Sequence, residues 1–163
     1  SRSEINNMVT RRRGEITFRI AAVLIILSAC FELIGVTSGA PLFGEMRGGI
    51  AAVIYHLIYA CLYLALGIGI WQATAWGYKL VFITTAVYTL DKAQYLLNRE
   101  KMLDSTLRQL AGSREILRMI DKNELVNIMT IAVLLFAAGW WGFALYTYFR
   151  RDYFRLNKDS VDS

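Results

Sequence analysis

The feature that most constrains this chain is the gathering of its apolar residues into four separate blocks. Each block is close to the roughly 20 residues that a helix needs to cross about 30 Å of hydrocarbon. Hydrophobic residues make up 56% of the chain and it has a single proline, so an ordinary soluble domain is a poor fit. The blocks therefore predict an all-α integral membrane protein, a four-transmembrane-helix bundle forming one membrane domain over residues 1–163. The four spans are expected at about 18–36, 49–71, 76–97 and 125–149.

The segment at about 99–122, between the third and fourth spans, has a different pattern. Its apolar residues recur at helical spacing, and charged residues occupy the other positions. This pattern predicts an amphipathic helical segment, which either lies on the membrane surface or packs across the mouth of the bundle. The link between the first and second spans, around Pro41, contains several glycines and predicts a turn-rich loop.

Basic residues near the ends of the spans set the expected orientation. Arginines precede the first span and follow the fourth, whereas the 99–122 segment mixes its basic residues with acidic ones. Both termini are therefore expected on the cytoplasmic side of the cell (inner) membrane. The flanking position of these residues also accounts for the net charge of +5, so nucleic acid is not an expected partner. The lipid bilayer is the expected partner, and the pattern leaves a homo-oligomer open.

Each of the four blocks also carries a polar side chain, at a similar depth from one membrane face. Glu32, His56 and Asp91 belong to the first three blocks, and the fourth has Thr130, with Asn127 nearer its end. Ionisable groups inside a membrane are costly, face the interior of a bundle and are functional by default. The expected result is one polar pocket near the outer face that binds a ligand or a proton. Its lining is Glu32, His56, Asp91, Tyr59, Tyr63, Tyr88, Tyr95, Asn127 and Thr130.

Three functions fit such a pocket, and solute or ion transport is the preferred one, with Glu32 exchanging a proton for a small cation. The first alternative is a partner-binding or structural membrane subunit, in which Glu32 only pairs with Lys92 or His56. The second is a membrane-embedded enzyme or metal site acting on an amphipathic substrate such as a lipid or a quinone. No motif in the sequence identifies a catalytic residue, so enzymatic activity is not the favoured interpretation.

The candidate cofactors follow from the same side chains. Glu32, His56 and Asp91 are competent ligands for a divalent metal, so a metal site is one hypothesis. The chain has one histidine, which excludes a bis-histidine haem within a single copy. It has no phosphate-binding loop, and no nucleotide site is expected.

The stretch FELIGVTSG, from Phe31 to Gly39, resembles the glutamate-bearing first helix of the small multidrug-resistance transporters, which are also four-span proteins. The resemblance implies proton-coupled transport of a cationic solute, with Glu32 as the coupling residue. It covers under a tenth of the chain. Those transporters are shorter and have no segment like the one at 99–122.

Overall fold

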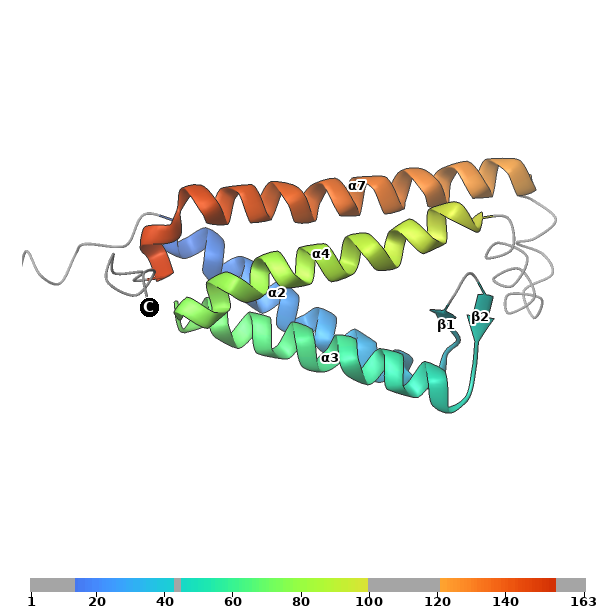
Figure 1. The fold of residues 1–163 in the computed structure, drawn as a ribbon, viewed down its shortest axis with the longest axis horizontal. Coiled ribbons are helices and arrows are strands. Elements are labelled where there is room, and N and C mark those ends of the chain that lie inside the picture. The colour runs from blue at the N-terminus through green and yellow to red at the C-terminus, as the bar shows by residue number, and fades with distance from the viewer. Residues whose placement is uncertain (1–13, 43–44, 100–120, 155–163) are drawn as a thin grey trace, which may run out of the picture.

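The computed structural model describes residues 14–42, 45–99 and 121–154. Four long helices run side by side along the molecule (Figure 1). They are α2 (Glu15–Ile34), α3 (Ile50–Trp71), α4 (Ala75–Leu97) and α7 (Lys122–Phe149). Two short 3-10 helices, η1 (Gly35–Thr37) and η3 (Arg151–Phe154), follow α2 and α7. The predicted amphipathic segment at 99–122 falls almost entirely outside the described residues and stays a prediction.

Among the described residues, three helices are long and apolar enough to cross a membrane: α2 together with η1, α3, and α7. These helices fit the predicted membrane protein. α4 is of similar length but more polar, because it contains Lys79, Asp91 and Lys92 and several threonines and tyrosines. The fourth span, the identity of the membrane and the orientation of the termini therefore stay predictions.

A small antiparallel hairpin connects α2 to α3, where the sequence predicted a turn-rich loop. Its strands are β1 (Ala40–Leu42) and β2 (Glu45–Arg47), with Ala40 opposite Arg47. The hairpin lies at the end of the molecule where α2 finishes and α3 begins (Figure 1). We call this the hairpin end. The opposite end, where α2 begins and α7 finishes, is the terminal end.

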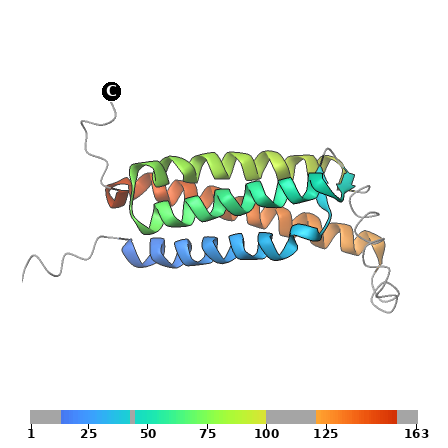
Figure 2. The same cartoon turned by 90° about the horizontal axis from the view of Figure 1, so that it is seen from below.

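The helices are held together pairwise. α2 packs along α3, α3 and α4 form an antiparallel pair, and α7 packs against α4. Figure 2 shows α2, α3 and α4 as neighbours, with α7 crossing behind them at an angle. The turn between α3 and α4 brings Gly69 and Gly77 together so closely that a Cβ on Gly77 would overlap the backbone of Gly69. Small residues at such a contact let two helix backbones approach each other.

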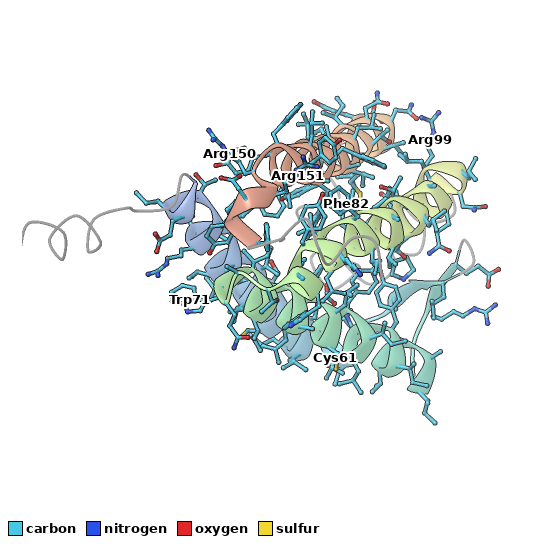
Figure 3. All side chains as sticks on the ribbon, turned by 60° about the vertical axis from the view of Figure 1, so that its left-hand side comes forward. Cys61, Trp71, Phe82, Arg99, Arg150 and Arg151 are labelled. Carbon is cyan, nitrogen blue, oxygen red and sulfur yellow. The ribbon has the colours of Figure 1, made fainter. Side chains whose placement is uncertain are left out.

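An aromatic cluster around Phe18 packs the terminal end. The fully buried Phe18 ring stacks on Tyr153 with 4.4 Å between centroids and meets Phe154 edge-on at 5.1 Å. The Tyr153 hydroxyl donates a hydrogen bond to the carbonyl oxygen of Ile70 at 3.1 Å. η3 thereby folds back onto α2 and α3. Basic side chains lie at both ends of the molecule, with Arg150 and Arg151 at the terminal end and Arg99 at the end of α4 (Figure 3).

Candidate functional site

Glu32 and His56 form the first polar pair of the hairpin end. Glu32 lies in the last turn of α2, and His56 lies in the second turn of α3, which packs on α2. The His56 Nδ1 and the Glu32 Oε2 are 2.7 Å apart. The His56 side chain is 12% exposed and the Glu32 side chain is 26% exposed. This distance is that of a short hydrogen bond. When Glu32 is ionised, the proton lies on Nδ1 and is donated to the carboxylate.

The second ring nitrogen of His56 is in a different situation. The Nε2 atom is buried and has no hydrogen-bond partner among the described residues. A nitrogen that carries a proton and a positive charge would be costly there without an acceptor. Among the described residues, the Glu32 carboxylate is therefore the group that would balance the positive charge of a protonated His56 ring.

Asp91 is the centre of the second polar cluster. Its side chain is 7% exposed and accepts three hydrogen bonds. The Tyr55 hydroxyl donates to Oδ2 at 2.9 Å, and the Lys92 Nζ donates to the same oxygen at 2.8 Å. The Gln94 Nε2 donates to Oδ1 at 2.9 Å. Both carboxylate oxygens are therefore held by donors, which is the usual condition for a buried charge.

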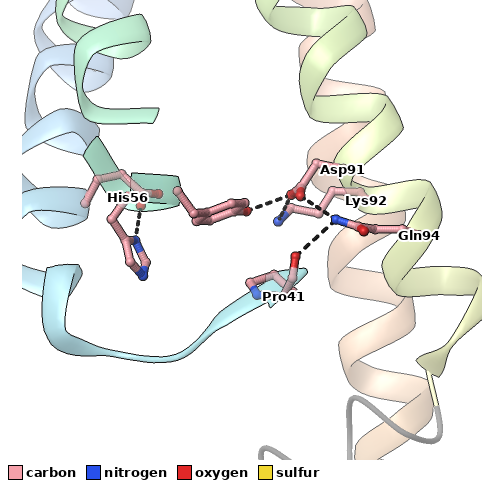
Figure 4. A network of polar contacts seen from close by, with 7 residues as sticks. Pro41, His56, Asp91, Lys92 and Gln94 are labelled. Atoms are coloured by element: carbon pink, nitrogen blue, oxygen red, sulfur yellow. Dashed lines mark hydrogen bonds and ion pairs between the residues drawn. The ribbon is translucent and has the colours of Figure 1, made fainter. Parts of the chain in front are cut away.

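Gln94 also connects Asp91 to the β-hairpin. Its Nε2 donates to the carbonyl oxygen of Pro41 in β1 at 3.1 Å. Figure 4 shows Asp91, Lys92 and Gln94 on α4, with Gln94 joined to Pro41 and with His56 on the opposite side of the view. The link between α2 and α3 is thus fixed against the end of α4.

Tyr55 lies between the two polar groups. Its hydroxyl bonds Asp91, and its ring meets the His56 ring edge-on with 5.4 Å between centroids. The carboxylate of Asp91 and the imidazole of His56 therefore both contact one side chain of α3.

A column of aromatic rings continues from Tyr55 toward the middle of the helices. Tyr59 follows Tyr55 at 4.9 Å between centroids, and Tyr63 follows Tyr59 at 5.5 Å. The indole of Trp140 on α7 is parallel to the Tyr63 ring at 6.1 Å and lies 5.9 Å from Tyr88 of α4. Trp140 also lines an apolar groove of about 490 Å³ between α2 and α7. The column thus joins the polar hairpin end to an apolar surface.

Two further features of this column bear on binding. The Lys92 ammonium lies over the Tyr88 ring, 5.3 Å from its centroid. The Tyr59 hydroxyl is buried and makes no hydrogen bond within the part of the chain described here. Aromatic faces and a carboxylate next to one another are the groups with which proteins bind ammonium ions.

Not every predicted pocket residue joins these contacts. On α7, the Thr130 hydroxyl bonds the Val126 carbonyl of its own helix at 2.7 Å, and Asn127 is exposed. Tyr95 is half-buried on α4 and is not one of the donors to Asp91. The other predicted pocket residues lie on α2, α3 and α4, and each takes part in the pairs, the cluster or the aromatic column described: Glu32, His56, Asp91, Tyr59, Tyr63 and Tyr88.

The described residues do not bring a set of metal ligands together. Within residues 14–42, 45–99 and 121–154, no three histidine, cysteine, aspartate or glutamate side chains form a group that could hold a metal ion. Glu32 is engaged with His56, whereas Asp91 is engaged with Lys92, Tyr55 and Gln94. The hypothesis of a Glu32–His56–Asp91 metal site thus gains no support from the described geometry.

The sequence interpretation missed Tyr55, Gln94 and Trp140 as parts of the site. Tyr55 could have been found from the antiparallel pairing of α3 and α4, since Tyr55 and Asp91 lie equally far from Ala73 in the connecting turn. Trp140 offered no such signal, because the position of α7 depends on packing between helices distant in sequence.

Comparisons of this chain with models of protein families, with curated proteins and with solved structures give no match.

Proposed function

We propose that this protein is a proton-coupled membrane transporter of small organic cations, in which Glu32 and His56 bind the proton. The observation that carries the proposal is the 2.7 Å contact between the two side chains, in helices that are apolar enough to span a membrane. Imidazole occurs in proteins in both a neutral and a protonated form, and its proton is held on a ring nitrogen. A histidine paired with a carboxylate is therefore suited to take up and release a proton.

The balance of charges supports exchange of a proton for a cation. When His56 is protonated, its charge and that of Lys92 balance the two carboxylates, Glu32 and Asp91. When His56 is neutral, the four groups together carry one negative charge. A buried uncompensated charge is costly, so the neutral state favours the entry of one positive ion. Proton and cation then bind alternately, which is the requirement for coupled exchange.

The aromatic column supports an organic cation as the transported species. Tyr59, Tyr63 and Tyr88, with Trp140 beside them, present ring faces next to the polar groups. Such faces attract ammonium groups and also accommodate alkyl substituents. A metal cation would instead require several oxygen or nitrogen ligands around one point.

The test is transport by the full chain in liposomes that contain a pH-sensitive dye. Butyltrimethylammonium is a suitable probe, because its fixed charge prevents it from crossing the bilayer as a neutral base. We expect an imposed gradient of this ion to drive proton movement in the wild type, and Glu32→Gln to abolish that movement. Cys30→Ser is the matched control, because Cys30 is two residues away on the same helix and exposed. Undiminished proton movement in Glu32→Gln, or none in the wild type with a series of alkylammonium ions, would contradict the proposal.

A second candidate function is structural, with the polar groups serving only to fix the helices relative to one another. The observation that favours it is the complete engagement of Asp91, both of whose oxygens accept hydrogen bonds. Removing one member of a buried pair is destabilising. Under this function, Glu32→Gln would lower the free energy of unfolding, and no alkylammonium ion would drive proton movement in the wild type.

A further inference from the structure

We infer that Asp91 and Tyr88 form a binding site for an alkylammonium ion, and that Lys92 occupies this site as a competitor tethered to the chain. The inference goes beyond the proposed function, because an ion bound here replaces the charge of Lys92, whereas the proposed exchange balances the charge that His56 loses. Binding to the site is a separate property and is tested separately.

Lys92 does not extend along the helix toward the nearest helix end. Its Nζ lies 2.8 Å from Oδ2 of Asp91, the preceding residue, and over the ring of Tyr88, one turn earlier. Lysines near the end of a membrane helix ordinarily stretch toward water. Neighbouring residues of a helix also point in different directions, so the side chain must bend to reach Asp91. The carboxylate and the ring face thus hold the ammonium in place of water.

The carboxylate is the fixed part of this arrangement. Tyr55 and Gln94 each donate a hydrogen bond to it, and the Asp91 side chain is 7% exposed. Lys92 has a long flexible stem and is 24% exposed. An anion held by two other residues remains preorganised when the lysine leaves. A preorganised anion beside an aromatic face binds an external ammonium with little ordering cost.

The Tyr59 hydroxyl is the independent sign that the site accepts more than the lysine. Tyr59 is 6% exposed, and its buried oxygen makes no direct hydrogen bond among the described residues, although Tyr55 and Asp91 lie close enough to interact with it. The ring lies 4.9 Å from that of Tyr55, the donor to Asp91. A primary ammonium has three N–H donors, and the lone pairs of a free tyrosine oxygen can accept one of them. An external ion can therefore satisfy a group that Lys92 leaves unbonded.

The lysine side chain is chemically an n-butylammonium ion attached to the backbone. Attachment gives it an effective concentration at Asp91 that a free ligand must exceed. Wild-type protein should consequently bind n-butylammonium weakly. Removal of the Lys92 side chain should leave a space that fits n-butylammonium, next to a carboxylate that favours a positive charge.

The experiment measures n-butylammonium binding by calorimetry with the full chain in nanodiscs. We expect Lys92→Ala to bind at least tenfold more tightly than the wild type, and the added change Asp91→Asn to remove that gain. Lys92→Met keeps the stem without the charge and should bind more weakly than Lys92→Ala, because the space stays filled. Lys79→Ala is the control, since Lys79 lies near the opposite end of α4 and is exposed. Equal affinities of Lys92→Ala and the wild type, or tight binding without the Asp91 carboxylate, would overturn the inference.

A second measurement on the unmodified chain covers the case in which Lys92→Ala does not fold. N,N-dimethylbutylammonium keeps one N–H donor and forms no stable amide, so it can be present while lysines are acetylated. We expect it to increase the acetylation rate of Lys92 severalfold and to leave that of Lys79 unchanged, as measured by mass spectrometry. A Lys92 rate that does not change up to saturating ligand would also overturn the inference. Tight binding by Lys92→Ala without any proton movement would retain this site and exclude the proposed transport, so the two failures are distinguishable.

Discussion

The two ends of the helical bundle are built from different interactions. At the terminal end, Phe18 is fully buried against Tyr153 and Phe154, and Gly69 touches Gly77. At the hairpin end, most described contacts join charged or hydrogen-bonding groups, as in the Glu32–His56 and Asp91–Lys92 pairs. Close packing of rings and backbones thus holds the terminal end, whereas ion pairs and hydrogen bonds connect the helices at the hairpin end.

Under the proposed function, this difference separates the part of the molecule that holds the fold from the part that binds a ligand. Close packing of rings and backbones admits little movement, because a displaced ring loses many contacts at once. Polar pairs can exchange partners with a proton or an ion at small cost in shape. The His56 Nε2 and the Tyr59 hydroxyl, both buried without partners in the described residues, lie at or next to the hairpin end. We therefore expect changes at the terminal end to affect mainly folding, and changes at the hairpin end to affect mainly ligand binding.

The largest expected effect on stability is that of Phe18→Ala. It removes the central ring of the aromatic cluster and leaves a cavity among Tyr153, Phe154 and Tyr146. We expect a loss of about 3 kcal/mol, the lower end of the range for buried phenylalanine, because lipid replaces water around part of the unfolded chain. Titration with sodium dodecyl sulfate in mixed micelles measures it. A loss below about 1 kcal/mol would mean that the cluster does not hold this end.

The contact between α3 and α4 should be the next most sensitive feature. Gly77→Ala places a methyl group against the backbone of Gly69, so we expect about 1–3 kcal/mol of destabilisation from overpacking. Gly139→Ala is the matched control, because a Cβ at Gly139 meets nothing within 4 Å. The same titration compares the two variants. Equal stability of both would show that the helices separate at low cost.

The helices themselves could be predicted from the sequence because they depend on local hydropathy. Each of the four long helices begins and ends within three residues of the bounds predicted for a span, as with Ile50–Trp71 against 49–71. The hairpin strands, β1 and β2, could not be predicted, since each is three residues long and Pro41 argued for a loop. Such short strands form through pairing with each other and through the Gln94 bond, neither of which leaves a periodic pattern.

The candidate site could be predicted by residue type but only partly by partner. Depth along each helix grouped Glu32 with His56, and these two side chains are in contact. It also grouped Thr130 with them, yet this hydroxyl bonds its own helix. Depth fixes a residue's position along the helix, whereas rotation about the axis and the crossing of α7 depend on packing. That information is distributed over many side chains, and no single motif carries it.

Tyr55→Phe tests the hairpin end by deleting one hydroxyl. Asp91 then keeps Lys92 and Gln94 as donors and loses its third hydrogen bond. A hydrogen bond to a charged group contributes about 1.5–3 kcal/mol, and we expect a destabilisation near the lower value because two donors remain. We also expect weaker n-butylammonium binding in the Lys92→Ala background, since the carboxylate is less firmly held. Unchanged affinity there would show that Tyr55 does not position Asp91.

The smallest effect is expected from Tyr153→Phe, the same deletion at the terminal end. The lost bond goes to the neutral carbonyl of Ile70, which still accepts from the Ala73 amide at 3.1 Å, so no buried acceptor is left without a donor. We therefore expect about 0.5–1 kcal/mol of destabilisation and no change in n-butylammonium affinity. The stacked ring stays in place against Phe18 in this variant. Because both variants remove one oxygen from one tyrosine, their difference isolates what the oxygen bonds to. A larger loss for Tyr153→Phe than for Tyr55→Phe would mean that hydrogen bonding, and not ring packing, holds the terminal end.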